Sequence, residues 1–109
     1  MALTNAMIIF NAQQDLLTEG KIKPTGRMIR VETPEGEKLI PEAEAIHTFA
    51  RWKELGYQVR RGQHAVAAFS IWKYTSKAKG QTEEDAIENG FCFLKRSFFF
   101  SASQVDKIA

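Results

Sequence analysis

Basic and aromatic residues are interleaved in three segments of the sequence, at positions 48–62, 69–74 and 91–101. Cationic side chains attract phosphate groups and flat rings stack on unpaired bases, so this combination is typical of a surface that binds single-stranded nucleic acid. The residues that we predict to form such a surface are Arg60, Arg61, Lys53, Trp72, Lys73, Tyr74, Lys95 and Arg96. Unpaired bases expose the faces that stacking uses, so single strands are expected to bind better than duplex.

Arg60 and Arg61 are the candidates for the principal phosphate contacts. They precede Gly62 in a predicted turn, where side chains are exposed and the backbone can approach a ligand closely. The alternative is that this pair belongs to a solvated turn and forms ion pairs with the acidic segment at residues 83–88. Exposed ion pairs are common and weak, so the sequence leaves both interpretations open.

The aromatic residues also have a structural interpretation. Trp52 falls on the same predicted helical face as Phe49 and Leu55, which favours packing in the core. The three phenylalanines at 98–100 cannot all point inward from one strand, because successive side chains alternate between its faces. The outward ring belongs either to a second packed layer or to a binding surface. A protein-interaction or dimerisation domain that uses the same aromatic surface is therefore the alternative function.

Residues that serve catalysis or metal binding are sparse. The sequence holds no phosphate-binding glycine loop and no dinucleotide fingerprint. His47 and His64 lack the i, i+4 spacing of a helical zinc site. The single cysteine, Cys92, lies between two phenylalanines, where a small buried hydrophobe is expected. We therefore expect no catalytic residue, no metal, no cofactor and no enzymatic activity.

The composition is that of a globular chain, with 109 residues of which 44% are hydrophobic and 26% are charged. This length predicts one domain over residues 1–109. No apolar run approaches the roughly 20 residues of a membrane helix, so no membrane partner is expected. The single cysteine and the lack of a secretory signal favour the cytoplasm.

The net charge is only +2, but charges of each sign are segregated along the chain. Residues 51–79 carry seven Lys or Arg against one Glu, whereas residues 83–88 carry four acidic side chains. This distribution is compatible with a basic face on a nearly neutral protein. An acidic segment close to that face would oppose nucleic-acid binding.

Hydrophobic spacing predicts the elements that must position these side chains. We expect a helix over residues 3–19, with Leu3, Met7, Phe10 and Leu17 on one face. A β-hairpin is expected over residues 27–40, around the turn at 33–36. A second helix is expected over residues 42–55, unless Thr48 acts as its N-cap and divides this stretch into a lead-in and a shorter helix.

Two antiparallel strands, at residues 64–73 and 91–100, complete the expected fold. Residues 57–61 form a short extended entry, residues 83–87 one helical turn, and residues 102–109 a polar tail. The predicted class is α+β: a small antiparallel sheet with two helices packed on one face, plus a β-hairpin.

The run of residues 48–62 resembles the N-terminal single-stranded-DNA-binding domain of ArdC-type antirestriction proteins. The resemblance lies in its Trp-Lys-Glu-Leu-Gly and Val-Arg-Arg-Gly elements. The sequence Phe-Ser-Ala-Ser-Gln-Val at 100–105 is similar to that domain's closing segment, and with the N-terminal helix the likeness spans most of the chain. Family members often continue into a zinc metalloprotease-like domain, whose His-Glu-x-x-His motif is absent here. The resemblance implies a DNA-binding module, not an enzyme, of the kind found in plasmids, integrative elements and phages.

Overall fold

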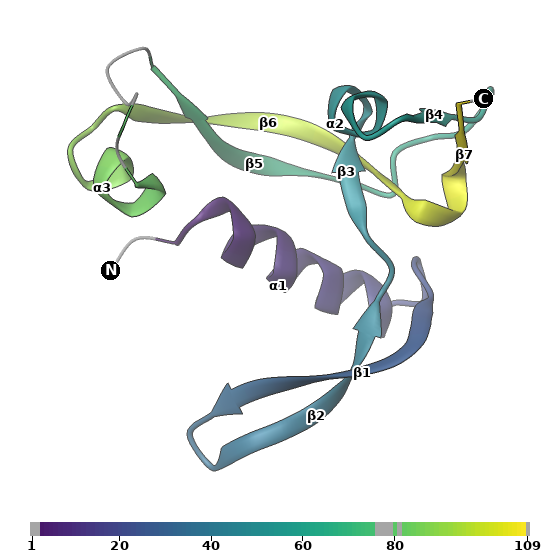
Figure 1. Ribbon diagram of the computed structural model, residues 1–109, viewed down its shortest axis with the longest axis horizontal. Helices are drawn as coiled ribbons and strands as arrows, with labels where there is room; N and C mark the ends of the chain where they lie inside the picture. Colours follow the sequence, from purple (N-terminus) through teal and green to yellow (C-terminus); the bar gives the residue numbers. More distant parts are fainter. Residues whose placement is uncertain (1–2, 76–79, 81, 109) are drawn as a thin grey trace.

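The α+β class is confirmed by the computed structural model, which describes residues 3–75, 80 and 82–108 (Figure 1). Helices, strands and a 3-10 helix follow one another along the described residues. They are α1 (Asn5–Thr18), β1 (Pro24–Thr33), β2 (Gly36–Ala43), β3 (Ile46–Thr48), α2 (Phe49–Glu54), β4 (Tyr57–Val59), β5 (Ala67–Tyr74), α3 (Glu83–Glu88), β6 (Cys92–Ser101), the 3-10 helix η2 (Ala102–Gln104) and β7 (Val105–Lys107).

The strands form three small antiparallel sheets within the described part of the chain. The first is the expected hairpin β1–β2, and the second has the order β3-β6-β5. The predicted long pair is confirmed, because β5 and β6 run antiparallel from the pair Ala67 and Phe99 to the pair Tyr74 and Cys92. The third sheet joins β4 to β7 through three residue pairs, so the expected polar tail contains a strand.

The two predicted helices pack into two different hydrophobic clusters, α1 into the first and α2 into the second. The first cluster consists of buried residues from α1, the loop after it, the end of β2 and the three-stranded sheet: Leu16, Ile22, Ala43, Ile46, Ile71 and Phe99. The second consists of Trp52, Val59 and Val105. We expected both helices to pack on one face of the sheet. Instead, α2 packs through Trp52 into the cluster that β4 and β7 complete, so Trp52 has the expected core role.

The buried side of α1 also differs from the side that we predicted. Leu16 is its buried residue, and Ile8, Ile9 and Ala12 pack beside it. Leu3 and Met7 are 55% and 43% exposed. A helix with apolar residues at 8, 9, 12, 16 and 17 offers a second stripe at the same helical spacing, and this stripe faces the sheet.

The stretch that we expected as one helix over residues 42–55 is divided at Thr48, as our alternative proposed. β2 continues through Pro41 to Ala43, which a two-stranded sheet tolerates because each strand has a free edge. Residues Ile46–Thr48 then pair with the end of β6. The Thr48 hydroxyl accepts a hydrogen bond from the Arg51 N–H at 3.2 Å and so caps α2.

Glu44, between β2 and β3, connects segments that are distant in sequence. Its side chain is almost fully buried and accepts hydrogen bonds from Lys23 N at 2.7 Å and from Ser103 N and Oγ at 2.8 and 2.7 Å. Its backbone carbonyl accepts a further bond from Gln13 Nε2 at 3.0 Å. Burial alone would raise the pKa of Glu44, but the hydrogen bonds from Lys23, Ser103 and Ser101 outweigh it and lower the pKa below its ordinary value.

Candidate nucleic-acid interface

A groove of about 580 Å³ brings together three segments that lie far apart in the sequence. One wall comes from the start of α2, another from the loop at residues 63–65, and the rest from β5 and β6. The lining residues are Thr48, Phe49, Ala50, Gln63, His64, Ala65, Lys73, Lys95, Ser97, Phe98 and Phe100. Of the predicted contacts, Lys73 and Lys95 meet here.

The ionisable side chains of this groove are all basic. Lys73, Lys95 and His64 line it, and no carboxylate does. Ion pairs within the described ranges involve Lys21, Arg30, Arg51 and Arg60, and leave Lys73 and Lys95 without an acidic partner there. Two lysines without a carboxylate partner create a positive potential that attracts an anionic backbone.

Aromatic rings line the same groove as these lysines. Phe49 is 51% exposed and Phe98 is 58% exposed, while Phe100 is half-buried. The rings of Phe49 and Phe100 meet edge to face, with centroids 6.4 Å apart. We had placed Phe49 on the core face of its helix. The alternation expected at 98–100 did identify an outward ring, since Phe98 is exposed and Phe99 is buried.

The loop at one end of the groove is held by Gln104, which is buried. Gln104 Nε2 donates to the carbonyl of His64 at 2.6 Å and to Gln63 Oε1 at 3.2 Å. Its Oε1 accepts from the Ser101 N–H at 2.9 Å, which completes a capping box around η2. The Ser-x-x-Gln spacing therefore fixes one wall of the groove.

Arg60 also stabilises the segment around Gln104, through hydrogen bonds to Asp106 and Ser103. Its Nε donates to Asp106 Oδ1 at 3.0 Å and its NH1 donates to the Ser103 carbonyl at 2.8 Å. The expected ion pair of this turn thus exists, but its partner is Asp106 rather than the acidic segment. Arg61 is exposed in the turn before Gly62, whose φ is +84°. Phosphate binding by Arg60 and Arg61 stays a prediction, and neither residue lines the groove.

The other predicted contacts lie elsewhere. Trp72 fastens the N-terminal end of α1: its N–H donates to Asn5 Oδ1 at 2.7 Å and its Nε1 donates to the Leu3 carbonyl at 2.8 Å. Arg96, which pairs with Ser70 across the sheet, is exposed and does not line the groove. Lys53 is exposed on α2 outside the groove.

Tyr74 lies at the far end of the β5–β6 pair, beside the acidic helix α3. Burial, the Glu83 charge and a hydrogen bond with Glu83 raise the pKa of Tyr74 to about 12. Cys92, its partner across the sheet, is half-buried, and burial and then Glu83 also raise its pKa. A negative charge at this end of the sheet opposes phosphate binding, so the groove with Lys73 and Lys95 is the better candidate.

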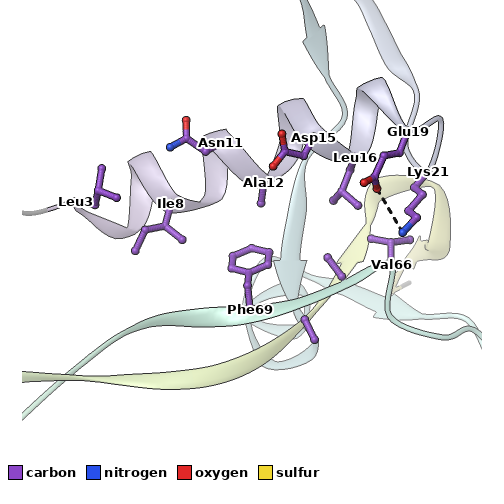
Figure 2. Close-up of a pocket in the computed structure, with 12 residues that line it drawn as sticks. Leu3, Ile8, Asn11, Ala12, Asp15, Leu16, Glu19, Lys21, Val66 and Phe69 are labelled. Carbon is purple, nitrogen blue, oxygen red and sulfur yellow. Dashed lines mark ion pairs between the residues drawn. The ribbon is translucent and has the colours of Figure 1, made fainter.

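A second hollow, between α1 and residues 66–69, has a different character (Figure 2). Its volume is about 500 Å³, and Leu16, Val66 and Phe69 supply apolar surface. Asp15 and Glu19 stand along its α1 side, where Glu19 pairs with Lys21 at 3.3 Å (Figure 2). The carboxylates disfavour an anionic strand, so we exclude this hollow from the candidate interface.

Among the described residues, no helix is long and apolar enough to cross a membrane. The family model for the N-terminal domain of anti-restriction factor ArdC matches residues 32–100. The matched range includes α2, β5 and β6, but leaves out α1 and most of β1 as well as the closing segment, so it is shorter than the resemblance we described. No curated protein and no solved structure matches the chain significantly.

Proposed function

Because the chain belongs to the family of N-terminal domains of anti-restriction factor ArdC, we propose that it binds single-stranded DNA largely independently of base sequence. The observation that carries this proposal is the groove in which Lys73 and Lys95 accompany the exposed rings of Phe49 and Phe98 without a carboxylate. The proposed module is not an enzyme. It belongs to a cytoplasmic protein of a plasmid, integrative element or phage.

The chemistry of the groove matches the two parts of a nucleotide. Lys73 and Lys95 would neutralise backbone phosphates, while the exposed rings of Phe49 and Phe98 would stack on bases. In a duplex the base faces are covered by their neighbours, so this mode of binding discriminates against double strands. Because stacking tolerates every base, the groove itself imposes little sequence preference.

Fluorescence anisotropy with a labelled oligothymidine, measured at several salt concentrations, tests this proposal. The double variant Lys73→Ala/Lys95→Ala should bind more weakly, and its salt slope should be smaller in magnitude by about 1.4, that is about 0.7 for each lost phosphate contact. Lys38→Ala, on the exposed hairpin, removes one positive charge outside the groove and serves as the control. Equal affinity for a duplex of the same length, or an unchanged slope in the double variant, would refute the proposal.

A protein-interaction function is the second candidate, and one observation favours it. At the far end of the β5–β6 pair, Tyr74, Phe93 and Leu94 are 47%, 52% and 55% exposed. Apolar side chains beside the acidic helix α3 suit a protein surface better than a phosphate backbone. Sedimentation equilibrium should then show a dimer that Leu94→Ser converts to a monomer, whereas a wild-type monomer at all concentrations would refute self-association.

A further inference from the structure

A smaller hollow opens beside the groove and shares part of its lining. We call it the side pocket; it has a volume of about 430 Å³, within the range of roughly 300–1,000 Å³ typical of small-molecule sites. Thr48, Ala50 and Lys73 line both the groove and the side pocket. A strand that follows the groove would therefore pass the mouth of the side pocket, with Lys73 available to the phosphate at that point.

The side pocket has an apolar floor and a polar rim. Ile71 and Phe99 are buried, and with the half-buried Ile9 of α1 they supply the apolar surface. The rim carries His47, held edge-on against Trp52 at 4.7 Å, and the exposed side chains of α2. An apolar floor with polar groups at the edge suits a flat heteroaromatic ring that hydrogen-bonds only along its rim.

Arg51 and Glu54 form the polar edge of the side pocket. Arg51 NH1 donates to Glu54 Oε2 at 3.0 Å, and both side chains are more than half exposed. This bond uses one of the five guanidinium N–H groups and one carboxylate oxygen. Within the described residues no other partner occupies these two groups, so a ligand would meet donors and an acceptor side by side.

We propose that the side pocket holds one unpaired guanine of the bound strand, an inference that rests on the proposed function. Guanine presents an acceptor, O6, next to two adjacent donors, N1–H and N2–H, on the edge that pairing would otherwise cover. Arg51 donates to O6, and Glu54 accepts from the two donors in charge-assisted hydrogen bonds. Adenine, cytosine and thymine each lack that pair of adjacent donors. The result is a preference at one position within otherwise sequence-tolerant binding.

The experiment compares labelled oligothymidines of equal length that carry a single central guanine, adenine or cytosine, together with the unsubstituted strand. Anisotropy should show that the guanine strand binds at least about 5-fold more tightly than the other three strands, which is the lower end of the effect expected for a bidentate base contact. Glu54→Gln should remove this preference without weakening the binding of oligothymidine, because it takes away a negative charge and no phosphate contact. Glu37→Gln, in the exposed ion pair with Arg30, is the matched control and should retain the preference.

Arg51→Lys provides a second variant that keeps the positive charge but loses the planar donor set, and it should also reduce the guanine preference. Circular dichroism establishes that each variant is folded. Tight and equal binding of all four strands, or a preference that persists in Glu54→Gln, would overturn the side-pocket assignment and leave the proposed function standing. Failure to bind any of the strands would overturn the proposed function, and the side pocket with it.

Discussion

Glu44 gives the sharpest stability prediction, because its buried carboxylate joins the loop before β1 to η2, and its backbone carbonyl accepts a hydrogen bond from α1. Replacement by Gln keeps the size of the side chain but substitutes an NH₂ group for an oxygen that accepts from N–H or O–H donors. The Lys23 N–H and the N–H and hydroxyl of Ser103 all donate to this carboxylate, and bonds to charged groups contribute roughly 1.5–3 kcal/mol each. Gln can retain part of this set, so we expect Glu44→Gln to lower the free energy of unfolding by about 2–4 kcal/mol.

The assay is urea unfolding followed by circular dichroism, supported by thermal unfolding. At about 4 °C or more for each kcal/mol, the midpoint temperature should fall by at least about 8 °C. The control is Glu42→Gln near the end of β2, two residues before Glu44, where the carboxylate accepts one exposed hydrogen bond from Thr25 at 2.9 Å. The control should change stability by less than about 1 kcal/mol. Equal and small effects of the two substitutions would refute the role that we assign to Glu44.

The pH dependence provides an independent check of the same residue. The folded state lowers the pKa of Glu44 below its ordinary value of 4.5, so the unfolded chain takes up the proton first as pH falls. The contribution of Glu44 to stability is therefore fully present above about pH 4.5 and is lost as pH falls through the folded pKa. Stability curves of the wild type and Glu44→Gln should converge in acid. Parallel curves down to the lowest pH at which the protein folds would contradict this assignment.

Two further predictions separate binding from structural roles. Phe98→Ala should weaken the binding of oligothymidine by about 5-fold or more, because stacking contributes roughly 1–3 kcal/mol per base. Phe93→Ala removes a similarly exposed ring outside the groove and should leave the affinity unchanged. Anisotropy measures both variants, and equal losses of affinity would contradict stacking in the groove. Arg60→Ala should lower the free energy of unfolding, measured in urea, by about 0.5–1.5 kcal/mol, because it removes the hydrogen bonds to Ser103 and Asp106. Arg61→Ala should leave the free energy of unfolding unchanged. A larger loss of stability for Arg61→Ala than for Arg60→Ala would contradict the structural role of Arg60.

The parts of the fold that were predictable from sequence are those set by local patterns. The turn at 33–36 and the apolar residues of β5 and β6 identified the hairpin and the central pair, because turn chemistry and β propensity act over a few residues. The type of Thr48 and its place before an aromatic helix predict an N-cap, and Thr48 does cap α2. Residues 57–59 were also expected to be extended, and they form β4.

The parts that were missed depend on contacts between distant residues. β7 is a strand because β4, more than 40 residues earlier, offers it an edge. Arg60 meets Asp106 in the same way, so no spacing rule could separate its bracing role from phosphate binding. Phe49 and Trp52 share a helical face in the sequence. Because α2 begins at Phe49 and has only six residues, Trp52 reaches the core while Phe49 stays at the surface.

The sequence predicted the kinds of side chain that meet at the candidate site, but not most of the individual residues. Lysines and aromatic rings do meet in one groove, yet only Lys73 and Lys95 of the predicted set line it. Trp72 and Arg96 do not line it; Trp72 instead hydrogen-bonds with Leu3 and Asn5 at the N-terminal end of α1, a long-range contact that local spacing does not predict. The contributions of His64 and Phe49 arise from the way that Gln104 and Thr48 fix their segments.

The most direct test of the central claim is a titration of the isotope-labelled protein with oligothymidine, followed by the backbone amide signals in NMR spectra. If single-stranded DNA binds in the groove, the amides of Phe49, His64, Lys95 and Phe98 should shift together with one saturation curve. The amides of the hairpin and of α3 should stay in place. Shifts confined to α3 and Leu94, or to the residues of the hollow in Figure 2, would contradict the assignment of the groove as the DNA-binding surface.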